Sequence, residues 1–149
     1  LTIREYLELG AFTLRSDGAT VDERIDRVLT IFPERGGRLG DRAGDLSGGQ
    51  QQMLALAKAL LLDPELLLID ELSLGLAPVA VEAILQVVER LKDQGQTMII
   101  VEQSINVALA VADRAVFLER GQVRFEGRAE DLRERDDLLR AVFLGTEGG

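Results

Sequence analysis

The sequence predicts an α/β fold in which helices flank a parallel sheet. Two short apolar runs, 66–69 and 97–101, have the length and composition of buried strands, and an amphipathic helical pattern separates them. Strand, helix and strand of these lengths form a βαβ unit, whose strands are expected to be parallel and whose crossover is expected to be right-handed. The chain is therefore expected to build part of an open α/β sheet.

The first 45 residues predict a small helical region. Apolar residues recur at helical spacing over 2–14 and again over 21–32, and Pro33 is expected to end the second helix. Several glycines between 36 and 44 then mark a loose connector. We interpret residues 1–45 as most of a helical subdomain and residues 46–149 as the C-terminal part of the α/β core.

The next predicted helix begins at Leu46-Ser47-Gly48-Gly49-Gln50. Ser47 suits the N-cap and Gln50 completes a capping box, so a well-capped amphipathic helix is one interpretation. That interpretation explains the adjacent glycines poorly. Glycine lets a backbone approach a ligand closely, and free amides at a helix N-terminus attract phosphate. The segment is therefore either a structural cap or a phosphate-binding turn.

Two carboxylates, Asp70 and Glu71, follow the first predicted strand directly. Carboxylates are costly to bury without a purpose, and ligands of open α/β sheets bind at the carboxyl ends of the strands. A solvated junction between strand and loop is the alternative. Taken with the glycine-opened helix about twenty residues earlier, the pair suggests a Mg-nucleotide site.

The remaining elements follow from local signals. Pro78 suits the first turn of the helix between the strands, and Gly95 suits its end. The sequence then predicts, in order, a short helix capped by Ser104, a strand over 115–118, a hairpin turn over 119–122, a strand over 123–125 and an amphipathic segment over 129–144.

Composition narrows the class of protein. The chain has 149 residues, a net charge of −9, and neither cysteine nor histidine. Disulfides, thiol chemistry and histidine bases are excluded, and a zinc site is disfavoured. The acidic balance disfavours binding to nucleic acid or to anionic lipid. No apolar run reaches membrane-spanning length, so we expect no direct membrane insertion. The first residue is Leu1, so a piece of a longer protein is expected.

Three motifs together resemble the nucleotide-binding domain of ABC transporters. Leu46–Gln50 resembles the family signature, the apolar run ending in Asp70-Glu71 resembles Walker B, and Ser73-Leu74-Gly75-Leu76-Ala77-Pro78 resembles the D-loop. Val101-Glu102-Gln103-Ser104 and Ala112-Asp113-Arg114 resemble the ATP-binding subunits of branched-chain amino acid importers. The resemblance covers nearly the whole chain, and it implies a P-loop NTPase-like core.

The resemblance also implies roles for individual residues. ATP would be contacted by Ser47, Gly48, Gly49 and Gln50, and Asp70 would hold Mg²⁺. Glu71 would orient the attacking water. Gln103 stands where many relatives carry a histidine that senses the γ-phosphate; a polar residue at a helix start is the alternative interpretation.

In the family, two such domains pair head to tail around two ATP molecules. The resemblance implies that Ser47–Gln50 serves ATP held by the partner, while Asp70 and Glu71 serve ATP in their own domain. The implied partners are a second ATP-binding subunit, identical or different, and transmembrane permease subunits. The implied location is cytoplasmic, peripheral on the inner face of the membrane.

A phosphate-binding loop of the form G-x-x-x-x-G-K-[ST] is absent from the sequence. We therefore expect the complete protein to be an ATPase and this fragment alone to be inactive. One alternative is an ABC ATPase of the chromosome-maintenance or DNA-repair type, although residues 1–45 lack the sustained heptads of its coiled coil. The other is a non-catalytic docking module.

Overall fold

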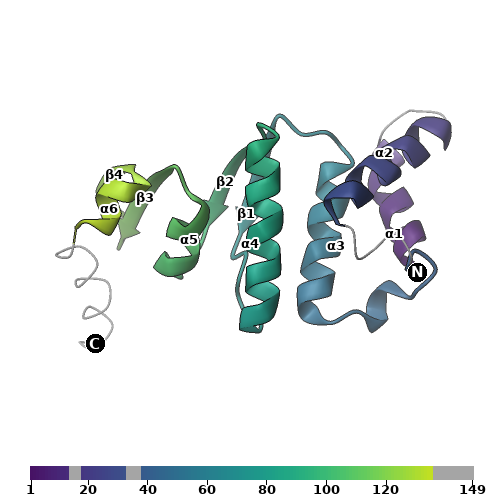
Figure 1. Cartoon of the computed structure of the whole chain (residues 1–149), viewed down its shortest axis with the longest axis horizontal. Coiled ribbons are helices and arrows are strands. Elements are labelled where there is room, and N and C mark those ends of the chain that lie inside the picture. Colours follow the sequence, from purple (N-terminus) through teal and green to yellow (C-terminus); the bar gives the residue numbers. More distant parts are fainter. Residues whose placement is uncertain (14–17, 33–37, 136–149) are drawn as a thin grey trace. The chain divides into compact units, whose positions relative to one another are not determined.

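The computed structural model describes residues 1–13, 18–32 and 38–135. The chain divides into two compact units, Leu1–Val101 and Glu102–Gly149, each described below by itself. Figure 1 shows the elements of both units. The boundary predicted near residue 45 lies inside the first unit and stays a prediction.

The N-terminal helices of the first unit are α1 (Ile3–Gly10), the 3-10 helix η1 (Ala11–Thr13) and α2 (Gly18–Ile31). Helix α1 begins at Thr2 with a capping box, because the Thr2 side chain accepts from the Glu5 amide and the Glu5 carboxylate accepts from the Thr2 amide. Both predicted helices are therefore confirmed over their described parts. Pro33, which is expected to end the second helix, lies outside the described residues.

Helix α3 (Gly48–Leu60) is central to the first unit. It follows a short 3-10 helix, η3 (Ala43–Asp45), and contacts α1, α2 and α4 (Pro78–Asp93). In Figure 1, α4 stands on one side of α3, and α1 and α2 stand on the other. The most deeply buried side chains come from α1, α2, α4 and the segment directly after α3, and they are Ile3, Leu7, Ile25, Val28, Leu61, Ile84, Val88 and Leu91.

The predicted βαβ unit is present. Strand β1 (Leu66–Asp70) pairs in parallel with β2 (Thr97–Val101), in a register that runs from Leu66 opposite Thr97 to Asp70 opposite Val101. Helix α4 joins the strands and has Pro78 in its first turn. The helix ends in a Schellman motif, in which Gly95 has a φ of 83° and the Gln96 amide donates to the Leu91 carbonyl at 3.0 Å.

The expectation that β1 is a buried strand is met on only one of its faces. Leu67 is 6% exposed, whereas its neighbour Leu68 is 69% exposed and Leu66 is 46% exposed. Strand β2 repeats the pattern, since Ile99 and Val101 are also exposed. Within the described residues this parallel sheet has two strands, and only one of its faces is covered. An aliphatic run alone does not say whether a second layer covers the other face.

The second unit is built around a hairpin. Strands β3 (Arg114–Glu119) and β4 (Gln122–Arg128) pair antiparallel, with Arg120 and Gly121 forming the two-residue turn that the sequence predicts. Helices α5 (Ile105–Val111) and α6 (Ala129–Arg133) contribute Leu109, Ala129 and Leu132 to a small core. The amphipathic segment expected over 129–144 is helical to Arg133, and its part beyond residue 135 lies outside the described residues.

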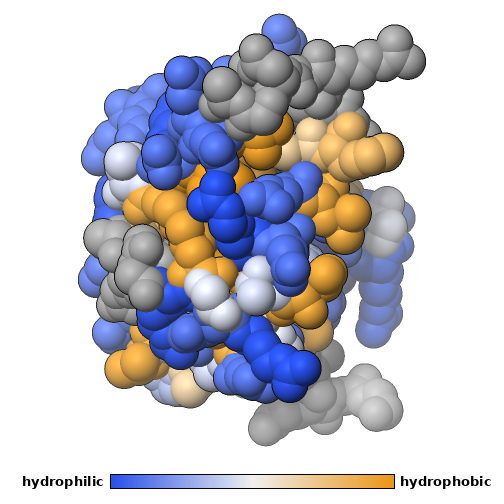
Figure 2. Space-filling model, turned by 90° about the vertical axis from the view of Figure 1, so that its right-hand side faces the viewer, coloured by the Kyte–Doolittle hydropathy of each residue, from blue (hydrophilic) through white to orange (hydrophobic). Residues whose placement is uncertain are grey.

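Some large apolar side chains lie on the surface of the first unit. Leu9 of α1 is 57% exposed and Phe12 of η1 is 83% exposed. Figure 2, which views the molecule from the side of α1 and α2, shows apolar surface between hydrophilic side chains. Among the described residues, none of the helices combines the length and the hydropathy needed to span a bilayer.

Candidate functional site

The Ser47–Gln50 turn forms the start of α3 as a complete capping box. The Ser47 hydroxyl accepts from the Gln50 amide at 3.4 Å, and the Gln50 side-chain oxygen accepts from the Ser47 amide at 3.1 Å. The structural interpretation of these two residues is therefore confirmed. It leaves the phosphate-binding interpretation open, because the amides of Gly48 and Gly49 lie in the first helical turn, where no acceptor exists within the helix.

The two glycines of this turn pack against the segment that begins α4. A methyl group on Gly49 would lie 2.5 Å from the Cβ of Ala80, while one on Gly48 would lie 3.7 Å from Leu76 Cδ2. The first distance is far below van der Waals contact and the second is ordinary contact. The structure therefore brings the signature-like turn next to the D-loop-like segment, although they are about thirty residues apart.

Asp70 and Glu71 lie where the sequence predicts, at the carboxyl end of β1. Asp70 is exposed and pairs in register with Val101 of β2. Glu71 donates its amide to the Val101 carbonyl at 2.8 Å, and its φ of 51° places it in the left-handed region. This backbone conformation is uncommon outside glycine and costs about 1–3 kcal/mol.

The segment from Glu71 to Ala77 folds as consecutive tight turns. The Leu74 amide donates to the Glu71 carbonyl at 3.4 Å, and the Leu76 amide donates to the Ser73 carbonyl at 3.2 Å. Gly75 has a φ of 71°, which explains why glycine stands there. The Ser73–Ala77 loop is thus tied to Glu71 on one side and packed against Gly48 on the other.

Gln103 belongs to the second unit and precedes α5. Ser104 is the N-cap of that helix, since its hydroxyl accepts from the Val107 amide at 3.5 Å. The carboxylate of Glu102 accepts from the amides of Gln103 and Ser104, at 3.0 and 3.1 Å. The polar position at a helix start is confirmed, and a role in catalysis stays a prediction.

Asp70 is the carboxylate that could bind a magnesium ion at this end of β1. Within the described ranges 1–13, 18–32 and 38–135, no group of three or more acidic side chains could enclose an ion. Magnesium keeps several waters and is usually bound through one or two carboxylates together with phosphate oxygens. The exposed carboxylate of Asp70 fits that mode of binding.

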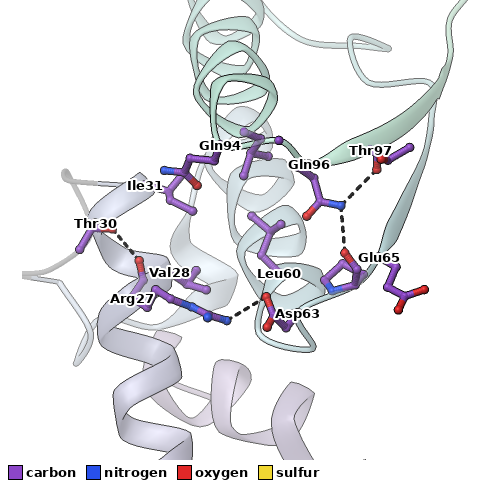
Figure 3. Close-up of a pocket in the computed structure, with 13 residues that line it drawn as sticks. Arg27, Val28, Thr30, Ile31, Leu60, Asp63, Glu65, Gln94, Gln96 and Thr97 are labelled. Atoms are coloured by element: carbon purple, nitrogen blue, oxygen red, sulfur yellow. Dashed lines mark hydrogen bonds and ion pairs between the residues drawn. The ribbon is translucent and has the colours of Figure 1, made fainter.

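A cavity of about 450 Å³ lies elsewhere in the first unit (Figure 3). In it, Arg27 forms an ion pair with Asp63 at 3.1 Å, and the side-chain amide of Gln96 donates to the carbonyls of Pro64 and Thr97 at 2.9 and 3.1 Å. Its lining reaches the amino ends of both strands, whereas Asp70 lies at the carboxyl end of β1. This cavity is therefore distinct from the predicted nucleotide site.

Sequence reasoning missed two features of the candidate site. The first is the left-handed conformation of Glu71, for which the residue type gives no signal. The second is the contact between Gly49 and Ala80. The sequence does contain a signal for this contact, because Ala80, a small residue, lies two positions after Pro78 at the start of α4.

Comparison with known proteins assigns the class. A family model described as "AAA domain, putative AbiEii toxin, Type IV TA system" matches residues 4–102. The chain therefore belongs to this AAA-domain family. Within it, two curated relatives identify the chain more narrowly as part of an ABC transporter ATP-binding domain.

Two curated relatives are named for branched-chain amino acid transport. The chain is 46% identical over 123 residues to "High-affinity branched-chain amino acid transport ATP-binding protein BraG" of Pseudomonas aeruginosa, covering 83% of this chain and 52% of the relative. It is 39% identical over 137 residues to "Probable branched-chain amino acid transport ATP-binding protein LivF" of Archaeoglobus fulgidus, covering 91% of this chain and 57% of the relative. The chain thus spans about half the length of these relatives.

Two solved structures show the same fold. CbiO1 from Clostridium perfringens, described as part of the ABC transporter complex cbiONQ, matches 96% of this chain and 57% of its own with a TM-score of 0.81 and 24% identity. The ATP-binding cassette MJ0796 is described as a dimeric post-hydrolysis state bound to ADP and Pi. It matches 87% of this chain and 57% of its own, with a TM-score of 0.69 and 31% identity. The predicted fold class is confirmed.

Proposed function

We propose that the complete protein is the ATP-hydrolysing subunit of a transporter that imports branched-chain amino acids or similar small solutes. The observation that carries this proposal is the 46% identity to BraG, whose name specifies branched-chain amino acid transport. Membership of the ABC family alone would leave the solute open. The relative LivF bears the same designation and supports the same choice.

In this proposal two ATP-binding subunits pair head to tail around ATP. The Ser47–Gln50 turn of one subunit contacts phosphate of the ATP held by the other, through the first-turn amides of α3 and the Ser47 hydroxyl. The dimeric cassette MJ0796, bound to ADP and Pi, supports the pairing. The D-loop-like segment Ser73–Ala77, which packs beside this turn, would contact the partner at the same place.

The proposed reaction is hydrolysis of ATP to ADP and phosphate. Water attacks the γ-phosphorus, and the bond from that phosphorus to the oxygen bridging it to the β-phosphorus breaks. Glu71 orients the water and accepts its proton, and Asp70 provides the carboxylate for Mg²⁺. When bound, Mg²⁺ neutralises charge on the phosphates. Gln103 donates a hydrogen bond from its amide to phosphate or water, and it stays uncharged at every physiological pH.

The other proposed partners are the permease subunits, which would hold the protein at the cytoplasmic face of the membrane. We also propose that the 149-residue chain alone has no ATP turnover, because it lacks a G-x-x-x-x-G-K-[ST] loop to hold the phosphates. Measurable turnover by the purified 149-residue chain would refute this part of the proposal.

The hydrolytic role of Glu71 is tested in the full-length protein. Glu71→Gln keeps size and hydrogen bonding but removes the base, so ATP turnover should fall at least a hundredfold while ATP-dependent pairing persists. Glu65→Gln is the matched control, because Glu65 is exposed and directly precedes the amino end of β1. Equal turnover in wild type and Glu71→Gln would remove Glu71 from the mechanism.

The solute and the rival functions are tested with the permease subunits. In reconstituted vesicles, ATP inside should drive leucine, isoleucine and valine uptake far faster than glutamine uptake. Turnover stimulated by DNA instead of by permease would favour the chromosome-maintenance type of ATPase. Failure of the full-length protein to bind ATP would favour a docking module.

A further inference from the structure

We propose that Ala80, in the first turn of α4, is a positioning residue for the Ser47–Gln50 turn. Its contact with Gly49 fixes how closely the start of α3 approaches the Ser73–Ala77 loop. The two segments therefore contact a ligand in a fixed position relative to each other. The role assigned to the turn rests on the proposed function. The contact itself is a property of the fold and can be tested separately.

The geometry at Gly49 leaves no space for a side chain. A methyl group there would lie 2.5 Å from the Cβ of Ala80 and 3.7 Å from its Cα. Carbon atoms in contact lie about 3.5–4.0 Å apart, so α3 and α4 would have to separate by about 1 Å or more. The Cβ of alanine is fixed to the backbone and cannot rotate away.

Ala80 is itself held firmly in place. Pro78 sets the backbone at the helix start. The Ala80 amide donates to the Ala77 carbonyl at 2.8 Å, and the Val81 amide donates to the same carbonyl at 3.1 Å. A clash at Gly49 would therefore push the starts of α3 and α4 apart, because neither backbone has room to give way locally.

The neighbouring glycine provides an internal comparison. A methyl group on Gly48 would be 3.7 Å from the flexible end of Leu76, which is ordinary contact. Close approach of a ligand to the backbone would account for either glycine. A packing requirement makes only Gly49 necessary, and it predicts that shortening Ala80 restores what a larger residue at Gly49 removes.

The test is a double-mutant cycle in the full-length protein with Gly49→Ala, Ala80→Gly and the double variant. Thermal midpoints, and kcat and KM for ATP, are measured at a temperature well below every midpoint so that all variants are folded. We expect Gly49→Ala to lower the midpoint and to reduce kcat at least tenfold. In the double variant, kcat should return to within about threefold of the value for Ala80→Gly alone. Its thermal midpoint should return to within a few degrees of that of Ala80→Gly. Gly48→Ala is a control for the thermal midpoint only, which it should leave unchanged or raise.

Three results would overturn the inference in distinguishable ways. Additive effects on the thermal midpoint would show that Gly49 and Ala80 do not contact each other as described. A double variant that regains its midpoint while its kcat stays as low as that of Gly49→Ala would show that Gly49 is needed at the ligand, and that Ala80 does not position it. A wild-type protein without ATP turnover would refute the proposed function, and the thermal cycle would still decide the contact.

Discussion

The amide of Glu71 donates to the carbonyl of Val101 at 2.8 Å while Glu71 holds a φ of 51°. The hydrogen bond thus continues the pairing of β1 with β2 for a further residue. The positive φ turns the chain sharply at the same residue. The side chain of the proposed base therefore starts from a backbone that the sheet itself fixes, immediately after Asp70.

The strain at Glu71 predicts an inverted effect of glycine. Glu71→Gly should be more stable than Glu71→Ala by about 1 kcal/mol, because only glycine accepts a positive φ without cost. Urea denaturation of the two variants measures the difference. Glu82, which is exposed on α4, is the control: there the glycine variant should be less stable than the alanine variant by about 1 kcal/mol. The same order at both positions would contradict the left-handed assignment.

Adjacent leucines of β1 should differ in their contribution to stability. Leu67→Ala removes a buried side chain and should cost about 2–5 kcal/mol in the free energy of unfolding. Leu68→Ala changes a side chain that is 69% exposed and should stay within about 0.5 kcal/mol of the parent chain. Denaturation of the 149-residue chain gives both values. Equal losses would show that a further layer covers Leu68.

The cap of α3 should be measurable without any ligand. Ser47→Ala removes the acceptor for the Gln50 amide and should cost about 1 kcal/mol, whereas Ser47→Asp should keep most of the stability. Chemical denaturation provides the comparison. If Ser47→Ala were as stable as the parent chain, the capping box would contribute nothing, and the serine would need another explanation.

The capping box of α1 predicts a pH dependence. The pKa of Glu5 is lowered, first by the backbone hydrogen bond from Thr2 and second by the Thr2 side chain. The ionised carboxylate is the form that the fold favours. Its contribution is therefore fully present above the ordinary glutamate pKa and is lost as the pH falls through the lowered value. Carboxyl NMR titration should place the pKa of Glu5 below the ordinary glutamate value, and Glu5→Gln should remove that part of the acid dependence.

The sequence predicted the features that depend on neighbouring residues. The caps at Ser47 and Ser104, the start at Pro78, the end at Gly95 and the turn after Glu119 all follow from local backbone preferences, and the structure contains each of them. The parallel pairing of β1 and β2 followed as well, because a helix of this length between two short strands permits little else.

Features that depend on which elements meet could not be predicted. The exposure of Leu68 depends on whether a layer covers the second face of the sheet, and an aliphatic run is silent on that. The need for glycine at Gly49 depends on Ala80, thirty-one positions later. At this position the sequence favoured a ligand as the reason for glycine, whereas the structure supplies a packing reason as well.

The uncovered row of Leu66, Leu68, Ile99 and Val101 has a practical consequence for handling the chain. Exposed apolar faces favour association between molecules, and here the net charge of −9 opposes it by mutual repulsion. Salt weakens that repulsion because the Debye length shrinks to about 3 Å at 1 M. Concentrated preparations of the chain should thus stay clear in buffer of low ionic strength and become turbid at high salt concentration.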